Sequence, residues 1–411
     1  MTNASTMTAP IAPPKELASL PVFDFDPYSD AHLLDPFPRL DEIRNAGSVV
    51  WLSHIGVPGL ARHAEVQAAL RDWETFSSAA GAGLDDLRHG DRWRPRSMLL
   101  ETDPPQHGVG RNVMNSVLSM AAARRMKESF EANAKQIVEE LVEKREFDAV
   151  EDLAARFVLK VFPDAVGIGP DGRENLLPWG DMVFNSFGPR NERFADSARR
   201  AEVVRRWVYE TATRPNVRAG SFGSEIYDAV DQGRITEEEG VILVGAMLTA
   251  GLDTTVTALS ASMLAFARFP SQWDVLRAQP QLKRQAFDEV VRWASPVQTF
   301  FRTTTRSVEV GGHAIPSDTK ILLFLGGANR DPAKFPSPER LDIERAAGGH
   351  VGFGFGIHQC VGQMIAKAEA EALFDALISR VARIELTGEP SYHLNNTVRA
   401  YHRIPVRIHP N

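Results

Sequence analysis

The feature that most constrains the fold is an apolar stretch near the middle of the chain, which predicts one very long helix. It begins at a capping box, Thr236 with Glu239, and must end before Pro270. About thirty residues rising 1.5 Å each give a helix of about 45 to 50 Å, which crosses a whole domain. One charge, Asp253, interrupts residues 241–267. Two glycines and several Thr and Ser in that range favour a buried core helix over a membrane span.

The middle of this predicted helix reads AGLDTT, residues 250–255. It is a poor helix sequence, because Gly251 loosens the backbone and the threonines are β-branched. Thr254 can donate its hydroxyl to a carbonyl one turn back and open a local bulge that admits water or a diatomic ligand. A satisfied core Thr beside a half-exposed Asp explains the segment equally well, so both interpretations stay open at this point.

The single cysteine, Cys360, lies in the glycine-rich segment HVGFGFGIHQCVG, residues 350–362. Dinucleotide binding lacks the strand-helix-strand unit and ribose-binding acid that it needs. A zinc site of His350, His358 and Cys360 lacks paired cysteines or a His-Glu-x-x-His element. An axial thiolate to haem iron fits better, because glycines let a loop approach a flat macrocycle and leave N–H groups for the sulfur. The helix that follows helps to keep the thiol ionised.

The net charge, the single cysteine and the first twenty residues limit the classes of protein that remain possible. A net charge of −7 and a pI near 5.9 give no general attraction to nucleic acid or anionic membranes. A single cysteine fits a reducing cytoplasm. Residues 1–20 lack the features of a signal peptide, so we expect a partly disordered leader and then a single domain over residues 21–411. Strands are expected over residues 48–53, 59–66, 302–312 and 319–326, and mostly helix over residues 121–240.

Five motifs occur in an order that resembles the cytochrome P-450 family over nearly the whole chain. The cysteine segment matches its signature at Phe353, Gly356, His358, Cys360, Gly362 and Ala366. The others are AGLDTT, EVVR with Glu289 and Arg292, FPSPERLDIER at residues 335–345, and DPPQHGVGR at residues 103–111. Leu341 stands where an aromatic residue is usual.

The resemblance implies a mainly α fold, a triangular helical prism with small β sheets, that holds haem b. Cys360 would ligate the iron, with Phe353 beside it, and Asp253 and Thr254 would form the catalytic acid-alcohol pair. The haem propionates would be held by His107, Arg111, Arg302 and His358. A buried ionic triad would be formed by Glu289, Arg292 and Arg340.

The implied activity is a monooxygenase reaction with O2. No flavin or iron-sulfur motif is evident, so we expect electrons from a ferredoxin and its NADH-linked reductase, and we expect a monomer. A basic docking patch is expected from Arg111, Arg124, Arg125 and Lys367. A haem-thiolate sensor is the alternative, although it has no use for Asp253 and Thr254.

Further segments resemble a bacterial subfamily that oxidises para-substituted benzoic acids, notably by O-demethylating 4-methoxybenzoate. An apolar slot for the ring is expected from Leu100, Phe184, Phe187, Ala250, Val297 and Phe300. Arg94 and Ser97 would hold the carboxylate. Ala246 and Gly245 depart from the subfamily, where a serine and an arginine stand. A longer acid such as a cinnamate is therefore the alternative substrate.

Overall fold

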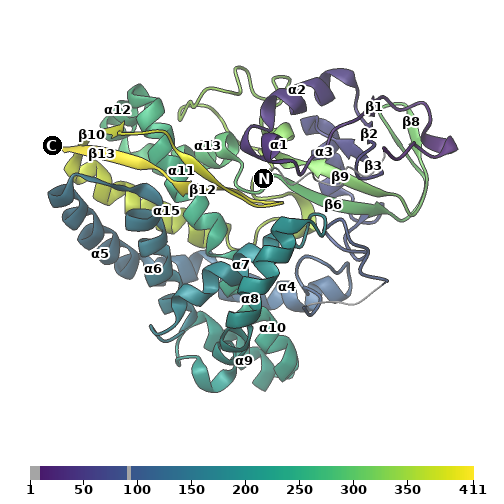
Figure 1. Ribbon diagram of the computed structural model, residues 1–411. Helices are drawn as coiled ribbons and strands as arrows, with labels where there is room; N and C mark the ends of the chain where they lie inside the picture. The colour runs from purple at the N-terminus through teal and green to yellow at the C-terminus, as the bar shows by residue number, and fades with distance from the viewer. Residues whose placement is uncertain (1–9, 90–93) are drawn as a thin grey trace.

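The computed structural model describes residues 10–89 and 94–411, and this part of the chain is mainly helical with small sheets. Figure 1 shows a roughly triangular outline, with helices over the left and lower parts and the largest sheet at the right. The α-helices are α1 (Asp30–Leu34), α2 (Phe37–Ala46), α3 (His63–Arg71), α4 (Gln106–Val117), α5 (Met120–Lys144), α6 (Arg156–Val166), α7 (Leu176–Asn185), α8 (Glu192–Thr211), α9 (Phe222–Asp231), α10 (Glu237–Ala250), α11 (Asp253–Arg268), α12 (Pro270–Ala278), α13 (Lys283–Ala294), α14 (Leu325–Asn329) and α15 (Gln363–Arg380). The strands are β1 (Val22–Phe23), β2 (Val50–Leu52), β3 (Val57–Leu60), β4 (Phe76–Ser77), β5 (Glu146–Asp148), β6 (Thr299–Thr304), β7 (Val308–Val310), β8 (His313–Ile315), β9 (Lys320–Phe324), β10 (Val381–Leu386), β11 (Ser391–Leu394), β12 (Arg399–Arg403) and β13 (Pro405–Pro410).

The predicted long helix is present but broken into α10 and α11 by a turn at residues 251–252. The capping box at Thr236 and Glu239 is confirmed, and α11 ends at Arg268, before Pro270. Gly251 also lets α6 pack closely at the break, because a methyl group at this position would lie 2.5 Å from the ring of Phe162.

The second half of this helix forms the centre of the main hydrophobic core. Every residue from Thr255 to Phe266 is buried. Residues 237–268 are long and apolar enough to cross a membrane by length and composition, but the core helix of a globular protein passes the same test. Its polar side chains are satisfied internally: Ser260 and Ser262 donate to carbonyls one turn back, at 2.8 and 2.9 Å. The expectation of a buried core helix is confirmed.

The largest sheet has six strands in the order β1-β2-β3-β9-β6-β4. The predicted strand pair near the start is present as the antiparallel β2 and β3, but the second strand ends at Leu60 and α3 begins at His63, within the range 59–66 that we expected to be a strand. Both later strand predictions are confirmed as β6, β7 and β9. The short strand β5 interrupts the range that we expected to be helical. Within the expected leader, residues 10–20 are packed: Ile11 donates its N–H to the Ser53 carbonyl at 2.8 Å, and Leu17 is buried. Residues 1–9 lie outside the described structure.

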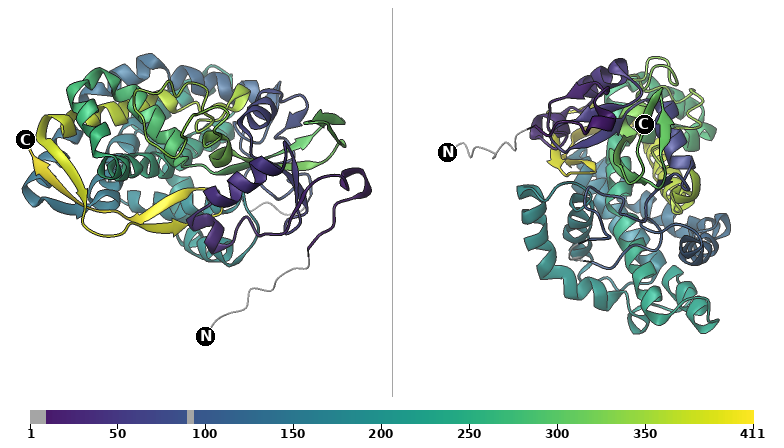
Figure 2. Two further views of the ribbon diagram at one scale, coloured as in Figure 1. Left: turned by 90° about the horizontal axis from the view of Figure 1, so that it is seen from above. Right: turned by 90° about the vertical axis from the view of Figure 1, so that its right-hand side faces the viewer.

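The C-terminal strands β10 to β13 were not expected. Figure 2 shows them as yellow ribbons that run from the C-terminal end of the molecule toward the purple N-terminal segment. Residues 393–396, at the end of β11 and in the turn that follows it, are hydrogen bonded to α7. The Asn395 amide donates to the Asp181 carboxylate at 2.8 Å, and the Asn396 N–H donates to the Asn185 side chain at 2.9 Å. The end of the chain thus fastens α7 in place.

Candidate active site

The glycine-rich segment forms a tight loop that presents Cys360 to the interior. The Cys360 N–H donates to the Phe353 carbonyl at 2.7 Å and closes the loop. Gly354 and Gly356 have φ angles of 70° and 69°, in the left-handed region that favours glycine. A side chain at Gly356 would also lie 2.5 Å from the Leu70 carbonyl oxygen. The helix α15 begins just after the loop, as the sequence predicted.

The sulfur of Cys360 is set up to bind a cation. Burial raises the pKa of its thiol, while the N–H groups of Gly362 and Gln363 and the charges of Arg111 and Lys367 oppose that rise. Because burial dominates, the thiol stays protonated at neutral pH when no cation is bound, so the expectation that the following helix keeps it ionised is not met by the protein alone. Haem iron would supply the missing positive charge, and the backbone N–H groups would then be hydrogen-bond partners of the thiolate.

A cavity lies between the cysteine loop, the break in the central helix and α7, with about 360 Å³ open to water-sized molecules. The side chains predicted to contact substrate all line it, namely Arg94, Ser97, Leu100, Phe184, Phe187, Ala250, Val297 and Phe300. Three of them form an aromatic wall: the ring centroids of Phe184 and Phe187 are 6.3 Å apart, and those of Phe187 and Phe300 are 5.5 Å apart. The cavity can therefore receive a flat apolar group.

At one end of the cavity, Arg94 forms an ion pair with the buried Glu101, a residue that the sequence analysis did not identify. Its guanidinium donates to both oxygens of the buried Glu101, at 2.7 and 2.9 Å. The Ser97 N–H donates to the same carboxylate at 2.9 Å. The guanidinium also lies over the Phe187 ring, 5.6 Å from its centroid. Arg94 is thus fixed in direction, and its charge is partly neutralised before any substrate binds.

The predicted acid-alcohol pair lies at the break between α10 and α11. Thr254 lines the cavity, and its hydroxyl donates to the Ala250 carbonyl at 2.9 Å, as the sequence predicted. Within the part of the chain that the structure describes, the buried Oδ2 atom of Asp253 has no hydrogen-bond partner. Burial, and then the charge of Asp181, raise the pKa of Asp253 well above its usual value. Burial thus favours the protonated form of the Asp253 carboxyl group, the form that can donate a proton.

Three of the four predicted propionate partners, Arg111, Arg302 and His358, line the cavity, while His107 lies behind His358 with ring centroids 4.6 Å apart. Arg302 is buried, and among residues 10–89 and 94–411 no carboxylate lies within ion-pair distance of it. Burial lowers the pKa of Arg302 to about 10. A buried cation of this kind needs an anion, and a haem propionate would fit.

The two histidines differ in their hydrogen-bond partners. His358 already uses both ring nitrogens, one with the Leu99 carbonyl and one with the Ser78 hydroxyl, each at 2.9 Å. Burial, and then the charges of His358 and Arg111, lower the pKa of His107 to about 4. The Nε2 atom of His107 has no partner in the described chain. Arg302 and Arg111 are therefore the cations that the geometry offers to a propionate.

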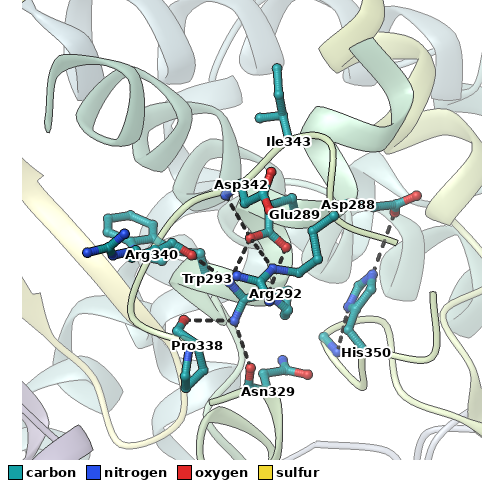
Figure 3. Close-up of polar contacts among 12 residues, drawn as sticks. Asp288, Glu289, Arg292, Trp293, Asn329, Pro338, Arg340, Asp342, Ile343 and His350 are labelled. Atoms are coloured by element: carbon teal, nitrogen blue, oxygen red, sulfur yellow. Dashed lines mark hydrogen bonds and ion pairs between the residues drawn. The ribbon is translucent and has the colours of Figure 1, made fainter. Parts of the chain in front are cut away.

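The buried ion pair predicted from EVVR is present, but its third member differs from the prediction. Glu289 and Arg292 are fully buried and joined at 2.7 Å. The additional cation is Arg345, whose Nε donates to Glu289 at 3.2 Å. The prediction of Arg340 is wrong, because its side chain is exposed and only its backbone carbonyl accepts from Arg292, at 3.1 Å. Figure 3 shows the Arg340 side chain directed away from Glu289.

The cluster around this pair anchors three parts of the chain. Arg292 also donates to the carbonyls of Asn329 and Pro338, both at 2.9 Å, and Glu289 accepts the N–H of Asp342 at 3.1 Å (Figure 3). Arg292 thus joins α13, α14 and the segment after Pro336. Leu341, the unusual residue of this segment, is buried in the main core.

The expected basic patch is less cationic at the surface than predicted. Lys367 is mostly buried and paired with Asp288 at 2.8 Å, and Arg111 donates to the Gln359 carbonyl at 2.6 Å. Arg125 is exposed but paired with Glu225. Arg124 is exposed, and its guanidinium is 3.4 Å from the sulfur of Met120.

The zinc alternative is not supported: within the described ranges, no three His, Cys, Asp or Glu side chains are grouped to hold a metal ion. His350 instead lies 3.6 Å from Asp288.

The sequence analysis missed several residues that line the cavity, namely Trp179, Tyr209, Thr249 and Glu369. Glu369 could have been found, because it lies one helical turn after Ala366 of the cysteine signature.

A helical fold around a cysteine loop, with a cavity lined by both Cys360 and Thr254 and with the buried Asp253 next to Thr254, defines a haem-thiolate monooxygenase. Residues 219–382 match the family model "Cytochrome P450". The protein "Cytochrome p450 CYP199A2" of Rhodopseudomonas palustris is 45% identical over 411 residues, covering all of both chains. The chain therefore belongs to the cytochrome P450 family, whose members bind haem b through a cysteine thiolate.

More distant relatives agree with this assignment. The beta-dihydromenaquinone-9 omega-hydroxylase of Mycobacterium tuberculosis is 28% identical and covers 94% of this chain and 79% of its own. Among solved structures, cytochrome P450 CREJ in complex with (4-ethylphenyl) dihydrogen phosphate has a TM-score of 0.83 and 25% identity, covering 94% of this chain and 99% of its own. CYP109Q5 from Chondromyces apiculatus has a TM-score of 0.80 and 27% identity, covering 94% and 99%.

Proposed function

We propose that this cytochrome P450 oxidises para-substituted aromatic carboxylic acids, and that O-demethylation of 4-methoxybenzoate-type acids is its main reaction. The observation that carries the proposal is the pairing of the aromatic wall with an oriented guanidinium at one end of the same cavity. The resemblance to the benzoate-oxidising subfamily supports it. CREJ, which holds a para-substituted aryl phosphate, is a second relative with a flat anionic ligand.

The residues of this chain would divide the work as follows. The aromatic wall would hold the ring, and Arg94 with Ser97 would bind the carboxylate, so that the para substituent faces Cys360. Haem held by Cys360 would supply oxygen activation and O–O cleavage. Asp253 would donate protons, and Thr254 would hold the water that carries them. Hydroxylation of a methoxy group gives a hemiacetal, which breaks down to a phenol and formaldehyde.

The first test is a titration of the haem spin-state shift with 4-methoxybenzoate, its methyl ester and 4-methoxycinnamate. We expect the benzoate to bind more tightly than the ester, and Arg94→Gln to weaken acid binding by about 1 to 3 kcal/mol, roughly 5- to 150-fold. The ester should bind the variant almost unchanged, because it makes no charge-assisted bond. Equal responses to acid and ester would contradict the proposal, and tighter binding of the cinnamate would favour the longer acid. Gly245 and Ala246, which line the cavity, leave room for it.

Thr254→Ala should retain haem and substrate binding but release hydrogen peroxide in place of product. We expect product formed per NADH to fall at least about 10-fold, since positioned proton donors contribute about 10²- to 10⁴-fold. Product and peroxide are measured against NADH consumed. Thr257→Ala is the matched control, because Thr257 is a buried threonine of the same helix that does not line the cavity. Unchanged coupling in Thr254→Ala would count against the assigned role.

We further propose that a ferredoxin with an NADH-linked reductase supplies the electrons, and that the protein acts as a cytoplasmic monomer. Arg124 and Arg125 are the exposed cations of the expected docking patch. Steady turnover with a ferredoxin would separate this enzyme from a haem-thiolate sensor.

A further inference from the structure

The carboxyl group of Asp253 occupies a space that one glycine leaves open. A methyl group at Gly180, in α7, would overlap the Oδ2 atom of Asp253 and lie 2.8 Å from its Cγ atom. Gly180 is in a helix interior, where glycine costs about 0.5 to 1 kcal/mol relative to alanine. The cost is explained if a side chain at this position is incompatible with the placement of Asp253.

The neighbour of Gly180 fixes a negative charge next to the same space. Asp181 accepts from Asn395 and His393, both at 2.8 Å, and from Arg200 at 2.6 Å. Burial opposes its ionisation, but the hydrogen bonds from His393 and Asn395 and the charge of Arg200 hold the pKa of Asp181 below its usual value. Asp253 therefore lies beside the Asp181 carboxylate, whose hydrogen bonds are already made by Asn395, His393 and Arg200.

We propose that Gly180 is a positioning residue for the reaction: by having no side chain, it allows the Asp253 carboxyl group to lie buried against α7, next to Asp181 and one residue from Thr254. The buried Oδ2 atom of Asp253, which has no partner within the described chain, is the atom that Gly180 accommodates. This inference rests on the proposed proton-donating role of Asp253 and adds the feature that sets its geometry.

The test compares Gly180→Ala, Asp253→Asn and the double variant in the haem-loaded protein. Turnover of Gly180→Ala should fall about 10- to 100-fold toward that of Asp253→Asn, with a larger solvent isotope effect. Substrate affinity, read from the spin-state shift, should change less than about twofold, so the loss is in kcat. In the Asp253→Asn background, adding Gly180→Ala should lower turnover by no more than about a further twofold. The carboxyl group whose position depends on Gly180 is already absent from that background.

The matched control is Gly108→Ala, a helical glycine of α4 where an added methyl group meets nothing within 4 Å. It should turn over like the unchanged protein. A readout independent of turnover is the crystal structure of Gly180→Ala, which should show the Asp253 side chain turned away from α7.

The outcomes separate the two claims. Full turnover in Gly180→Ala, with Asp253→Asn impaired, overturns the role of Gly180 alone. Multiplying losses in the double variant also overturn it, since Gly180 would then act independently of Asp253. Full turnover in Asp253→Asn overturns the proton-donating role itself.

Discussion

Cys360→Ser is expected to lose the red-shifted, displaced Soret band of the reduced carbon monoxide complex. Its monooxygenase activity should be lower than that of the unchanged protein by more than about 100-fold. Loss of an outer partner of a metal site already costs about 10- to 100-fold, and Cys360 is the predicted ligand itself. A serine hydroxyl is far less acidic than a thiol and donates less electron density to iron, so O–O cleavage slows. Retention of the displaced band by Cys360→Ser would remove the basis of the proposed enzyme.

The same residue allows a measurement that does not depend on activity. The chain has one cysteine, so a thiol reagent reports on Cys360 alone. We expect the haem-free protein to react with one equivalent of reagent and the haem-loaded protein to be protected. Equal reactivity of the two forms would show that the sulfur is not bound to iron. Cys360→Ser serves as the blank, because it has no thiol to react.

Arg292→Leu is expected to lower the free energy of unfolding by about 3 to 5 kcal/mol, because it leaves the fully buried Glu289 carboxylate without its partner. It also leaves the carbonyls of Asn329 and Pro338 without their donor. Glu289→Gln should cost less, about 1 to 3 kcal/mol, because the amide oxygen still accepts hydrogen bonds. Urea unfolding of the haem-loaded variants measures both effects, and a drop in haem content at expression should accompany the larger one.

Arg340→Leu and Arg345→Leu are the matched pair for this prediction. Arg340 contributes a backbone carbonyl to the cluster, so loss of its exposed side chain should change the free energy of unfolding by no more than about 0.5 kcal/mol. Arg345 contacts Glu289 directly and should cost more, about 1 to 3 kcal/mol. Equal losses of unfolding free energy in the two variants would indicate that the Arg340 side chain also contributes to the cluster.

The parts of the fold that were predicted correctly are those in which local chemistry decides. The capping box at Thr236, the end of α11 before Pro270 and the bond from Thr254 to Ala250 all follow from residues within one or two turns. The cysteine loop was predicted because its glycines are required by backbone geometry that few other residues adopt. Such signals are present in a single sequence.

The features that were missed depend on contacts between distant segments. Arg340 and Arg345 are five residues apart in one irregular segment, and only its path over α13 decides which guanidinium reaches Glu289. The ion pair between Arg94 and Glu101 is a local exception, since it spans seven residues of one irregular segment in which residue spacing does not decide which side chains meet. The C-terminal strands were missed because their pairing partners include β5, more than two hundred residues earlier. Hydrophobic periodicity indicates which face of a strand is buried, but it does not identify the distant strand that pairs with it.

The fastening of α7 by residues 393–396 has a consequence for biosynthesis. These residues are made after α7 and the central helix, so a growing chain has α7 without these hydrogen bonds until residues 393–396 emerge from the ribosome. We expect haem to enter most easily in this interval, because α7 forms part of the cavity wall and is then held by fewer contacts.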